Sequence, residues 1–307
     1  MAMNTPGPNM SEADTAQRIL VPLDGSDLAA KALPVAESIA RRLSARLDLV
    51  VVVPPLVLPF VGGEPYIPGE VYVRLDSERT ESAQKYLATV AQAARDHGVP
   101  TQTWLEHGEP ASRLLDVAGE LHSALIVMTT HGRTGLARFA LGSVADRVVR
   151  AGAAPVLLLR SFTEPAQDAD LTRAIVPLDG SSLAEQPLWS VVPLLAGRVL
   201  REVTLLRVAD PRDGEPGRQL CENYLDALRQ RLMDRLGGGG CVVSVQAVSG
   251  RNPAATIIER AGGGAHDLVV MSTHGEAGVG RWAFGGVADR VLRDGKTPLL
   301  LVHPPRK

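Results

Sequence analysis

One long segment of this chain occurs twice, and the duplication constrains the fold more than any other feature. Residues 19–26 read ILVPLDGS, and residues 174–181 read AIVPLDGS. Further along, residues 128–150 read MTTHGRTGLARFALGSVADRVVR, and residues 271–293 read MSTHGEAGVGRWAFGGVADRVLR. Because both motifs recur in the same order, a whole domain has been duplicated. We expect each half to bind its ligand in a similar way.

The two copies differ in length. The offset between them is 155 residues from Asp24 to Asp179 but 143 from His131 to His274, so the second copy is 12 residues shorter. Residues 54–73 have no close counterpart, and their five prolines and three glycines predict a long loop rather than a helix. Such loops are often lids or contact surfaces, although a plain surface excursion explains this one equally well. We place the domains at 15–161 and 172–304, with residues 161–171 as a polar linker.

Short apolar runs alternate with helical patterns in both halves. Continuously apolar runs, such as residues 50–53, are typical of strands covered on both faces. The alternation predicts an α/β fold with two tandem, doubly wound, five-stranded parallel-sheet domains. We expect strands at 18–23, 46–53, 101–106, 124–130 and 155–160, helices at 27–43, 74–97, 110–122 and 143–151, and second-half strands near 173–178, 200–208, 241–248, 267–273 and 298–302.

Composition narrows the class of protein. Lys and Arg number 32 against 34 Asp and Glu, which argues against a general nucleic-acid or anionic-membrane binder. Cys221 and Cys241 both lie in the second half, so we interpret them as free thiols in a reducing compartment. The polar first 15 residues do not resemble a signal peptide, and no apolar run is long enough to span a membrane. These features predict a soluble cytoplasmic protein.

Polar residues follow the first strand of each half. Ligands of open α/β sheets bind beyond the carboxyl ends of the strands. Turn and helix-cap chemistry explains Gly25 and Ser26 well. It explains Asp24 less well, because Asp24 precedes the turn and a carboxylate there suits a ribose hydroxyl.

A glycine loop follows the fourth strand. His131 and Gly132 are followed by nine residues and then by Gly142-Ser143. A strand end, a glycine loop and a new helix can cradle an anion with backbone N–H groups and a hydroxyl. His131 and His274 each follow an apolar strand and precede a glycine. Histidines in such places more often form hydrogen bonds with the loop backbone than take part in catalysis. No cluster has metal-ligand spacing, and Gly237–Gly240 lacks the residues of a phosphate-binding P-loop.

These residues resemble the universal stress protein family, over nearly the whole chain and as two tandem copies. The resemblance implies a Rossmann-like, adenine nucleotide alpha hydrolase-like fold that binds ATP, with Mg²⁺ accompanying the phosphates rather than a protein metal site. It also implies pairing of the two domains through their last strands, Pro155–Arg160 and Pro298–Val302. The implied nucleotide-binding residues are Pro22, Asp24, Val52, Thr129, Gly132, Gly142, Ser143 and Val144 in the first half, and Pro177, Asp179, Val208, Ser272, Gly275, Gly285, Gly286 and Val287 in the second.

Departures from the family pattern leave three functions open. Both halves lack the first motif glycine, with Thr129 and Ser272 in its place. The second half also has Gly286 for Ser143 and Glu276 for Arg133, which predicts weaker phosphate binding there. The chain is therefore expected to be an ATP-binding stress protein, with a stress scaffold that has lost nucleotide and acts through protein partners as the alternative, and a weak ATPase as the third possibility. A further homodimer is left open.

Overall fold

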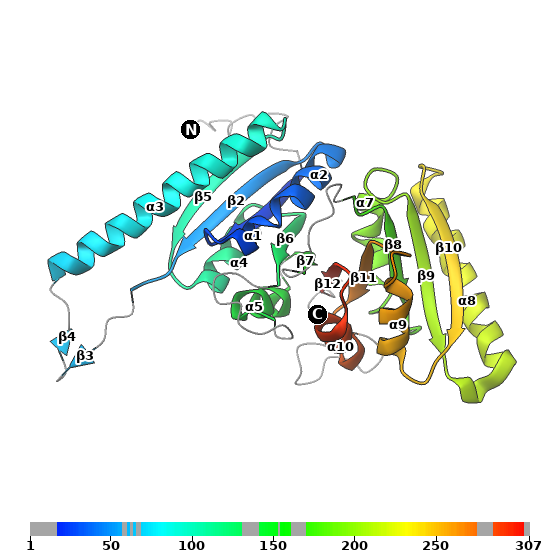
Figure 1. Ribbon diagram of the computed structural model, residues 1–307. Coiled ribbons are helices and arrows are strands. Elements are labelled where there is room, and N and C mark those ends of the chain that lie inside the picture. The colour runs from blue at the N-terminus through cyan, green and yellow to red at the C-terminus, as the bar shows by residue number, and fades with distance from the viewer. Residues whose placement is uncertain are drawn as a thin grey trace, which may run out of the picture.

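The computed structural model describes residues 17–56, 60–61, 64–65, 69–130, 141–152, 154–160, 170–274 and 285–303. Ten strands of these residues form one sheet in the order β10-β9-β8-β11-β12-β7-β6-β1-β2-β5 (Figure 1). The first five in chain order are β1 (Arg18–Leu23), β2 (Arg46–Val53), β5 (Thr101–His107), β6 (Leu125–Thr129) and β7 (Val156–Leu159); the second five are β8 (Arg173–Pro177), β9 (Glu202–Ala209), β10 (Val242–Ser249), β11 (Leu268–Ser272) and β12 (Leu299–Val302). The predicted α/β class and doubly wound strand order are confirmed.

Helices cover both faces of this sheet. The first half carries α1 (Asp27–Ala30), α2 (Leu33–Leu43), α3 (Gly69–Asp96), α4 (Pro110–Glu120) and α5 (Ser143–Ala151). The second half carries α6 (Gln186–Trp189), α7 (Val192–Leu195), a 3-10 helix (Pro211–Asp213), α8 (Gly214–Leu236), α9 (Pro253–Ala261) and α10 (Gly286–Asp294). A small separate pair, β3 (Phe60–Val61) and β4 (Glu64–Pro65), precedes α3.

Two helix predictions were wrong in their bounds. The helix expected over 27–43 is broken after Ala30, because Pro34 lies in the first turn of α2 and a proline cannot continue a helix from the preceding turn. The loop expected over 54–73 ends earlier, because α3 begins at Gly69. The last of its five prolines is Pro68, so nothing after it opposes helix formation. Residues 57–59, 62–63 and 66–68 of that loop, and 161–169 of the linker, lie outside the described residues.

The two halves meet at β7 and β12, the only antiparallel neighbours among the described strands of the large sheet. Leu157 lies opposite Leu300, and the two are 143 positions apart, the same offset as the histidine motifs. Equivalent residues therefore face each other, and an approximate twofold axis passes through this pair. The predicted pairing of the last strands is confirmed, and it covers what would otherwise be two open sheet edges.

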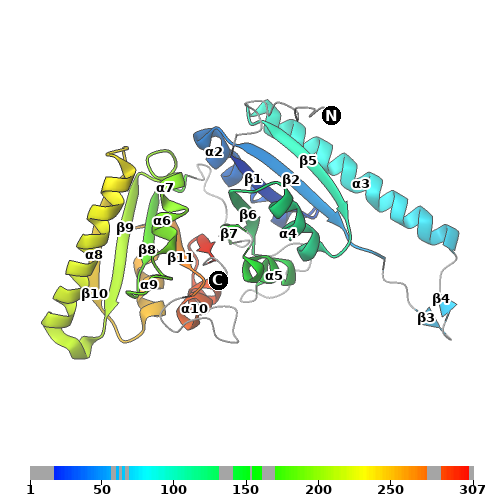
Figure 2. The ribbon, with the colours of Figure 1, turned by 180° about the vertical axis from the view of Figure 1, so that it is seen from behind.

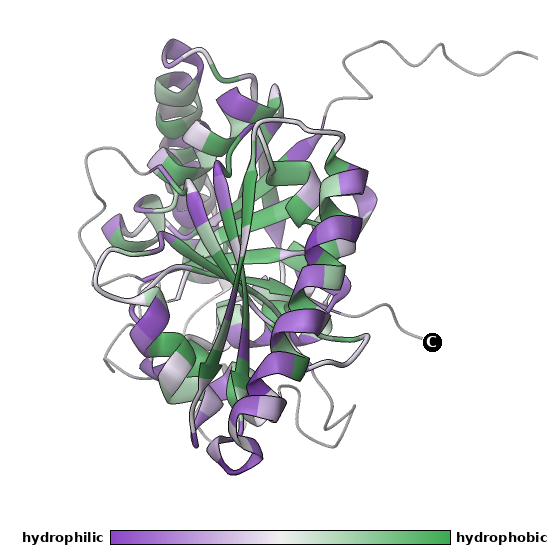
Figure 3. Cartoon of the chain, turned by 90° about the vertical axis from the view of Figure 1, so that its right-hand side faces the viewer, coloured by the Kyte–Doolittle hydropathy of each residue, from purple (hydrophilic) through white to green (hydrophobic). Residues whose placement is uncertain are grey.

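The core consists of two layers, one on each face of the shared sheet. Buried side chains from α1, α2, α3, α6, α7 and α8 form one layer. Those from α4, α5, α9 and α10 form the other. Both layers run through both halves, and Figure 3 shows apolar strands between helices whose outer faces are polar. Seen from behind, α3 and α8 lie toward opposite ends of the sheet, with α5 and α10 near its centre (Figure 2).

Equivalent side chains cross between the halves. Arg160 follows β7 and donates to the carbonyl oxygens of Leu292 and Val291 at the end of α10. His303 follows β12 at the equivalent place, and its Nε2 lies 3.1 Å from the carbonyl oxygen of Arg150 in α5. Burial lowers the pKa of Arg160 to about 10. Because these contacts join helix C-termini to the opposite domain, the pairing extends beyond the two strands.

Over the described residues, no helix is both long and apolar enough to cross a membrane.

Candidate functional site

A cavity of about 800 Å³ opens at the carboxyl ends of β1, β2 and β6 in the first half. It lies between the two helix layers, with α3 on one side and the start of α5 on the other. Seven of the eight residues that the sequence placed at a first-half nucleotide site line this cavity, and the eighth, Gly132, lies outside the described residues. The seven are Pro22, Asp24, Val52, Thr129, Gly142, Ser143 and Val144.

Asp24 serves the turn after β1 as well as the cavity wall. Its Oδ1 accepts hydrogen bonds from the backbone N–H of Ser26 at 2.9 Å and from the Ser26 hydroxyl at 2.6 Å. The Ser26 hydroxyl oxygen in turn accepts from the N–H of Ala29, so it caps α1. Turn chemistry therefore explains more of Asp24 than the sequence suggested. The carboxylate nevertheless lines the cavity, where it can reach a ligand.

The start of α5 supplies backbone donors. The N–H of Gly142 donates to the carbonyl oxygen of Thr130 at 2.8 Å, which closes the glycine loop back onto the end of β6. Gly142 has no side chain to cap the helix, so the N–H groups of Ser143, Val144 and Ala145 form its uncapped first turn. All three residues line the cavity. The first turn of a helix attracts anions because its N–H groups and the helix dipole both present positive charge.

The α3 wall of the cavity was not predicted from the sequence. It comprises Leu75, Glu78, Arg79, Ser82, Ala83 and Tyr86. Residues 74–97 are recognisable as an amphipathic helix, but the pattern does not say that the polar side of its first turns faces a cavity. That depends on where α3 crosses β2, and no short-range signal in the sequence encodes it.

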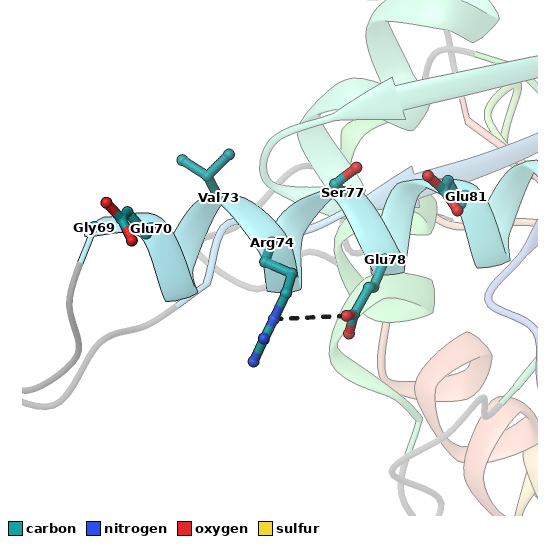
Figure 4. Close-up of a pocket in the computed structure, with 7 residues that line it drawn as sticks. All are labelled: Gly69, Glu70, Val73, Arg74, Ser77, Glu78 and Glu81. Atoms are coloured by element: carbon teal, nitrogen blue, oxygen red, sulfur yellow. Dashed lines mark ion pairs between the residues drawn. The ribbon is translucent and has the colours of Figure 1, made fainter.

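A second hollow, of about 730 Å³, is not a comparable site. It lies along the first turns of α3, and every lining residue comes from that helix between Gly69 and Glu81 (Figure 4). Arg74 and Glu78 form an ion pair there at 3.8 Å, with both side chains largely exposed. A single helix cannot enclose a ligand, so we place the candidate site in the cavity shared by α3, α5 and the strand ends.

The second half forms the same hydrogen bonds in its Asp-Gly-Ser turn and at the end of its glycine loop. Oδ1 of Asp179 accepts from the N–H and hydroxyl of Ser181 at 2.9 and 2.7 Å, as Asp24 does from Ser26. The N–H of Gly285 donates to the carbonyl oxygen of Thr273 at 2.8 Å, as that of Gly142 does to Thr130. Pro177 ends β8, Val208 lies in β9, Ser272 ends β11, and Gly286 and Val287 begin α10. Gly275 and Glu276, like Arg133, lie outside the described residues.

The two halves differ in residue type at one position of their second strands. Pro22 pairs with Val50 across β1 and β2, and Pro177 pairs with Leu206 across β8 and β9. The next residue along is Val51 in the first half and Arg207 in the second. Val51 lines the open cavity. An arginine at the equivalent place brings a long charged side chain into the same region of the second half.

The Arg207 side chain lies over the ring of Tyr224 in α8, with 4.7 Å between the guanidinium carbon and the ring centroid. Two of its nitrogens lie 3.0 and 3.1 Å from where a Cβ atom would stand at Gly180. Tyr224 donates its hydroxyl to Glu185 at 2.9 Å. Burial and this bond to the Glu185 carboxylate raise the pKa of Tyr224. The region that corresponds to the first cavity is therefore occupied by the chain's own side chains.

The histidine of the second loop has structural partners. His274 is buried, its Nδ1 lies 3.0 Å from the Thr273 hydroxyl, and its ring centroid lies 5.4 Å from that of His303. His131 falls outside the described residues. Among the residues that the structure describes, no group of three or more His, Cys, Asp or Glu side chains is placed to hold a metal ion.

Comparison with known proteins agrees with this architecture. The profile of the universal stress protein family matches residues 15–160 and 171–303, so the chain belongs to that family as a tandem, two-domain member. Universal stress protein MJ0531 of Methanocaldococcus jannaschii is 38% identical over 145 residues, which cover 47% of this chain and 82% of that protein. A universal stress protein of Mycolicibacterium smegmatis is 26% identical over 96% of this chain and 100% of its own length.

Solved structures show the same fold. A universal stress protein from Archaeoglobus fulgidus superposes with a TM-score of 0.70 at 18% identity, over 95% of this chain and 99% of that one. Another universal stress protein was solved in complex with cAMP. It covers 48% of this chain and 98% of its own, at 24% identity and a TM-score of 0.33.

Proposed function

We propose that this universal stress protein binds an adenine nucleotide, ATP, in the cavity of its first domain, as a structural or regulatory ligand. The observation that carries the proposal is the meeting of the strand-end and glycine-loop residues around one cavity. Its volume of about 800 Å³ falls in the range of roughly 300–1,000 Å³ that is usual for small-molecule sites. A cytoplasmic location is part of the proposal, and both cysteines are free, as expected in a reducing compartment.

The lining residues suit the parts of such a ligand. Apolar side chains at the end of β2, with the backbone of Val52, suit the adenine ring. The Asp24 carboxylate suits a ribose hydroxyl. The first-turn N–H groups of α5 and the hydroxyl of Ser143 suit the phosphates. Mg²⁺ would be held by the phosphates and water rather than by a protein cage.

We further propose that the first half binds nucleotide and the second half does not. Arg207 lies in the equivalent region of the second half, between Gly180 and the ring of Tyr224, which is in turn hydrogen-bonded to Glu185. A ligand would have to displace the Arg207 side chain. The loss of the Ser143 hydroxyl at Gly286 acts in the same direction.

The test is the nucleotide content and stoichiometry of the full chain. We expect heat treatment of purified protein to release an adenine nucleotide detectable by chromatography. Calorimetric titration of stripped protein with ATP should show one site per chain. Absence of both carried and titrated nucleotide would favour a scaffold role through protein partners. Steady release of inorganic phosphate would indicate an ATPase.

A further inference from the structure

Arg79 is a charged residue in the cavity that neither the sequence motif nor the fold requires. It lies in α3, and its side chain lines the cavity together with the start of α5. Its Nη1 atom is buried and has no hydrogen-bond partner among the described residues. A buried guanidinium nitrogen without an acceptor is unfavourable, because it has lost its water without gaining a protein partner. Such an atom in a cavity wall indicates that a ligand supplies the acceptor.

Other arginines of the first half donate hydrogen bonds from their guanidinium groups to protein acceptors. Arg18 donates from Nε and Nη2 to the two carboxylate oxygens of Asp48, each at 2.8 Å. Arg113 pairs with Glu106 at 2.6 Å, and Arg95 donates twice to the carbonyl oxygen of Thr101. Arg46 and Arg160 also have a buried Nε atom without a partner in the described part of the chain, but neither residue lines the cavity. Arg79 differs from these because its Nη1 atom has no acceptor there and the residue lines the cavity.

The two carboxylates of the cavity wall do not replace that acceptor. Glu78 pairs with Arg74 of the same helix. Asp24 uses Oδ1 for the turn with Ser26. No ion pair joins either carboxylate to Arg79 among the described residues.

We infer that Arg79 binds the anionic part of the ligand from the α3 side of the cavity, so that the site selects phosphorylated nucleotides over the nucleoside. This inference rests on the proposed nucleotide function. A guanidinium offers five N–H donors in a planar fork that matches a phosphate. The first-turn N–H groups of α5 approach from the other helix layer. A phosphate chain between the two would therefore be held by donors from both layers.

The second half lacks this arginine. Tyr86 and Leu87 of α3 correspond to Tyr224 and Leu225 of α8, because the same dipeptide occurs in each helix and its leucine is buried in the same core layer. Arg79 stands seven residues before Tyr86, and Gly217 stands seven residues before Tyr224. The arginine that lines the cavity from α3 is thus found in the half whose cavity is open.

Calorimetry on the full chain tests the inference with ATP, AMP and adenosine. We expect Arg79→Met to weaken ATP binding about 10- to 100-fold, the effect of losing hydrogen bonds to a charged group. Adenosine affinity should change less than about twofold, because adenosine has no phosphate. Arg74→Met is the matched control: Arg74 lies on the same helix, is exposed, does not line the cavity, and pairs with Glu78 (Figure 4). It should leave all three affinities unchanged.

A melting curve without nucleotide separates ligand binding from a structural role. Arg79→Met should melt at or above the temperature of the wild type, because the substitution removes a buried nitrogen that has no acceptor among the described residues. Equal ATP affinity for wild type and Arg79→Met would overturn this inference alone, and so would an equal loss of ATP and adenosine. If wild-type protein binds none of the three ligands, the proposed function fails and this inference with it.

Discussion

The two halves of this protein share a backbone fold but differ in one region, the corner at the carboxyl ends of their first, second and fourth strands. Both turn through Asp-Gly-Ser after the first strand and both close the glycine loop onto the fourth strand with one hydrogen bond. In the first half, Val51 leaves the corner open. In the second, Arg207 occupies it and stacks on Tyr224. Under the proposed function, retention of the motif does not imply retention of the site, because one side chain beside the motif takes the space of the ligand.

The largest expected effect comes from Gly142→Val. Gly142 has φ −61° and ψ 148°, a backbone that valine also adopts, so the substitution acts through the space its side chain takes. We expect ATP binding to be lost in calorimetry, because the branched side chain stands where phosphates approach α5. The matched control is Gly285→Val, at φ −63° and ψ 147° in the second half. It should bind ATP as the wild type does; loss of binding in this variant alone would place the site in the second half.

Val51→Arg should have the next largest effect. It copies the second half's residue into the first cavity, where Tyr86 stands at the position of Tyr224. We expect ATP affinity to fall at least about tenfold, from the volume and the ordering cost of the added side chain. Val51→Leu adds bulk without charge or length and should weaken binding less. If Val51→Arg binds ATP more tightly, the arginine at this position contributes to binding instead of blocking it.

The converse substitution, Arg207→Val, should open a second site of lower affinity. The calorimetric stoichiometry is expected to rise from one to two ATP per chain. Gly286 lacks the hydroxyl of Ser143, and Glu276 adds negative charge, so the new site should bind about 5- to 150-fold more weakly than the first. A stoichiometry that stays at one would show that Arg207 is not what closes the second half.

A smaller effect concerns stability against acid. The arginine that begins the first strand pairs with Asp48 of β2 in the first half, whereas Arg173 pairs with Asp267 before β11 in the second. Burial raises the pKa of Asp267, but bonds from the side chain and N–H of Arg173 and the Thr172 hydroxyl outweigh it, so the pKa is lowered. Its stabilising contribution is thus complete above the unfolded pKa near 4 and is lost as pH falls through the lower folded value.

Asp267→Asn tests that contribution by urea unfolding at pH 7 and at pH 3. We expect the variant to lose about 1–2 kcal/mol at pH 7, because a partly exposed, charge-assisted pair becomes a neutral one. The difference from wild type should shrink at pH 3. A deficit that is the same at both pH values would mean that the charge of Asp267 does not stabilise the second half.

Much of the fold follows from features that are local in the sequence. Continuous apolar runs such as residues 50–53 predict strands buried on both faces, and their alternation with helical patterns predicts the parallel order of each half. Helix bounds were less accurate, as the break at Pro34 and the early start of α3 show. The pairing of β7 with β12 was expected from the family resemblance, and the register through Leu157 and Leu300 shows its symmetry.

The sequence by itself determined the duplication, the strand order and the position of the glycine loops, because these depend on periodicity and on residues a few positions apart. Only the tertiary structure decided what fills the corner beside each motif. Val51 and Arg79 stand 28 positions apart and line one cavity because α3 crosses β2. Arg207 and Tyr224 likewise come together because α8 packs on β9. A side chain's direction at such a crossing is set by the packing of the layers, which local sequence patterns do not encode.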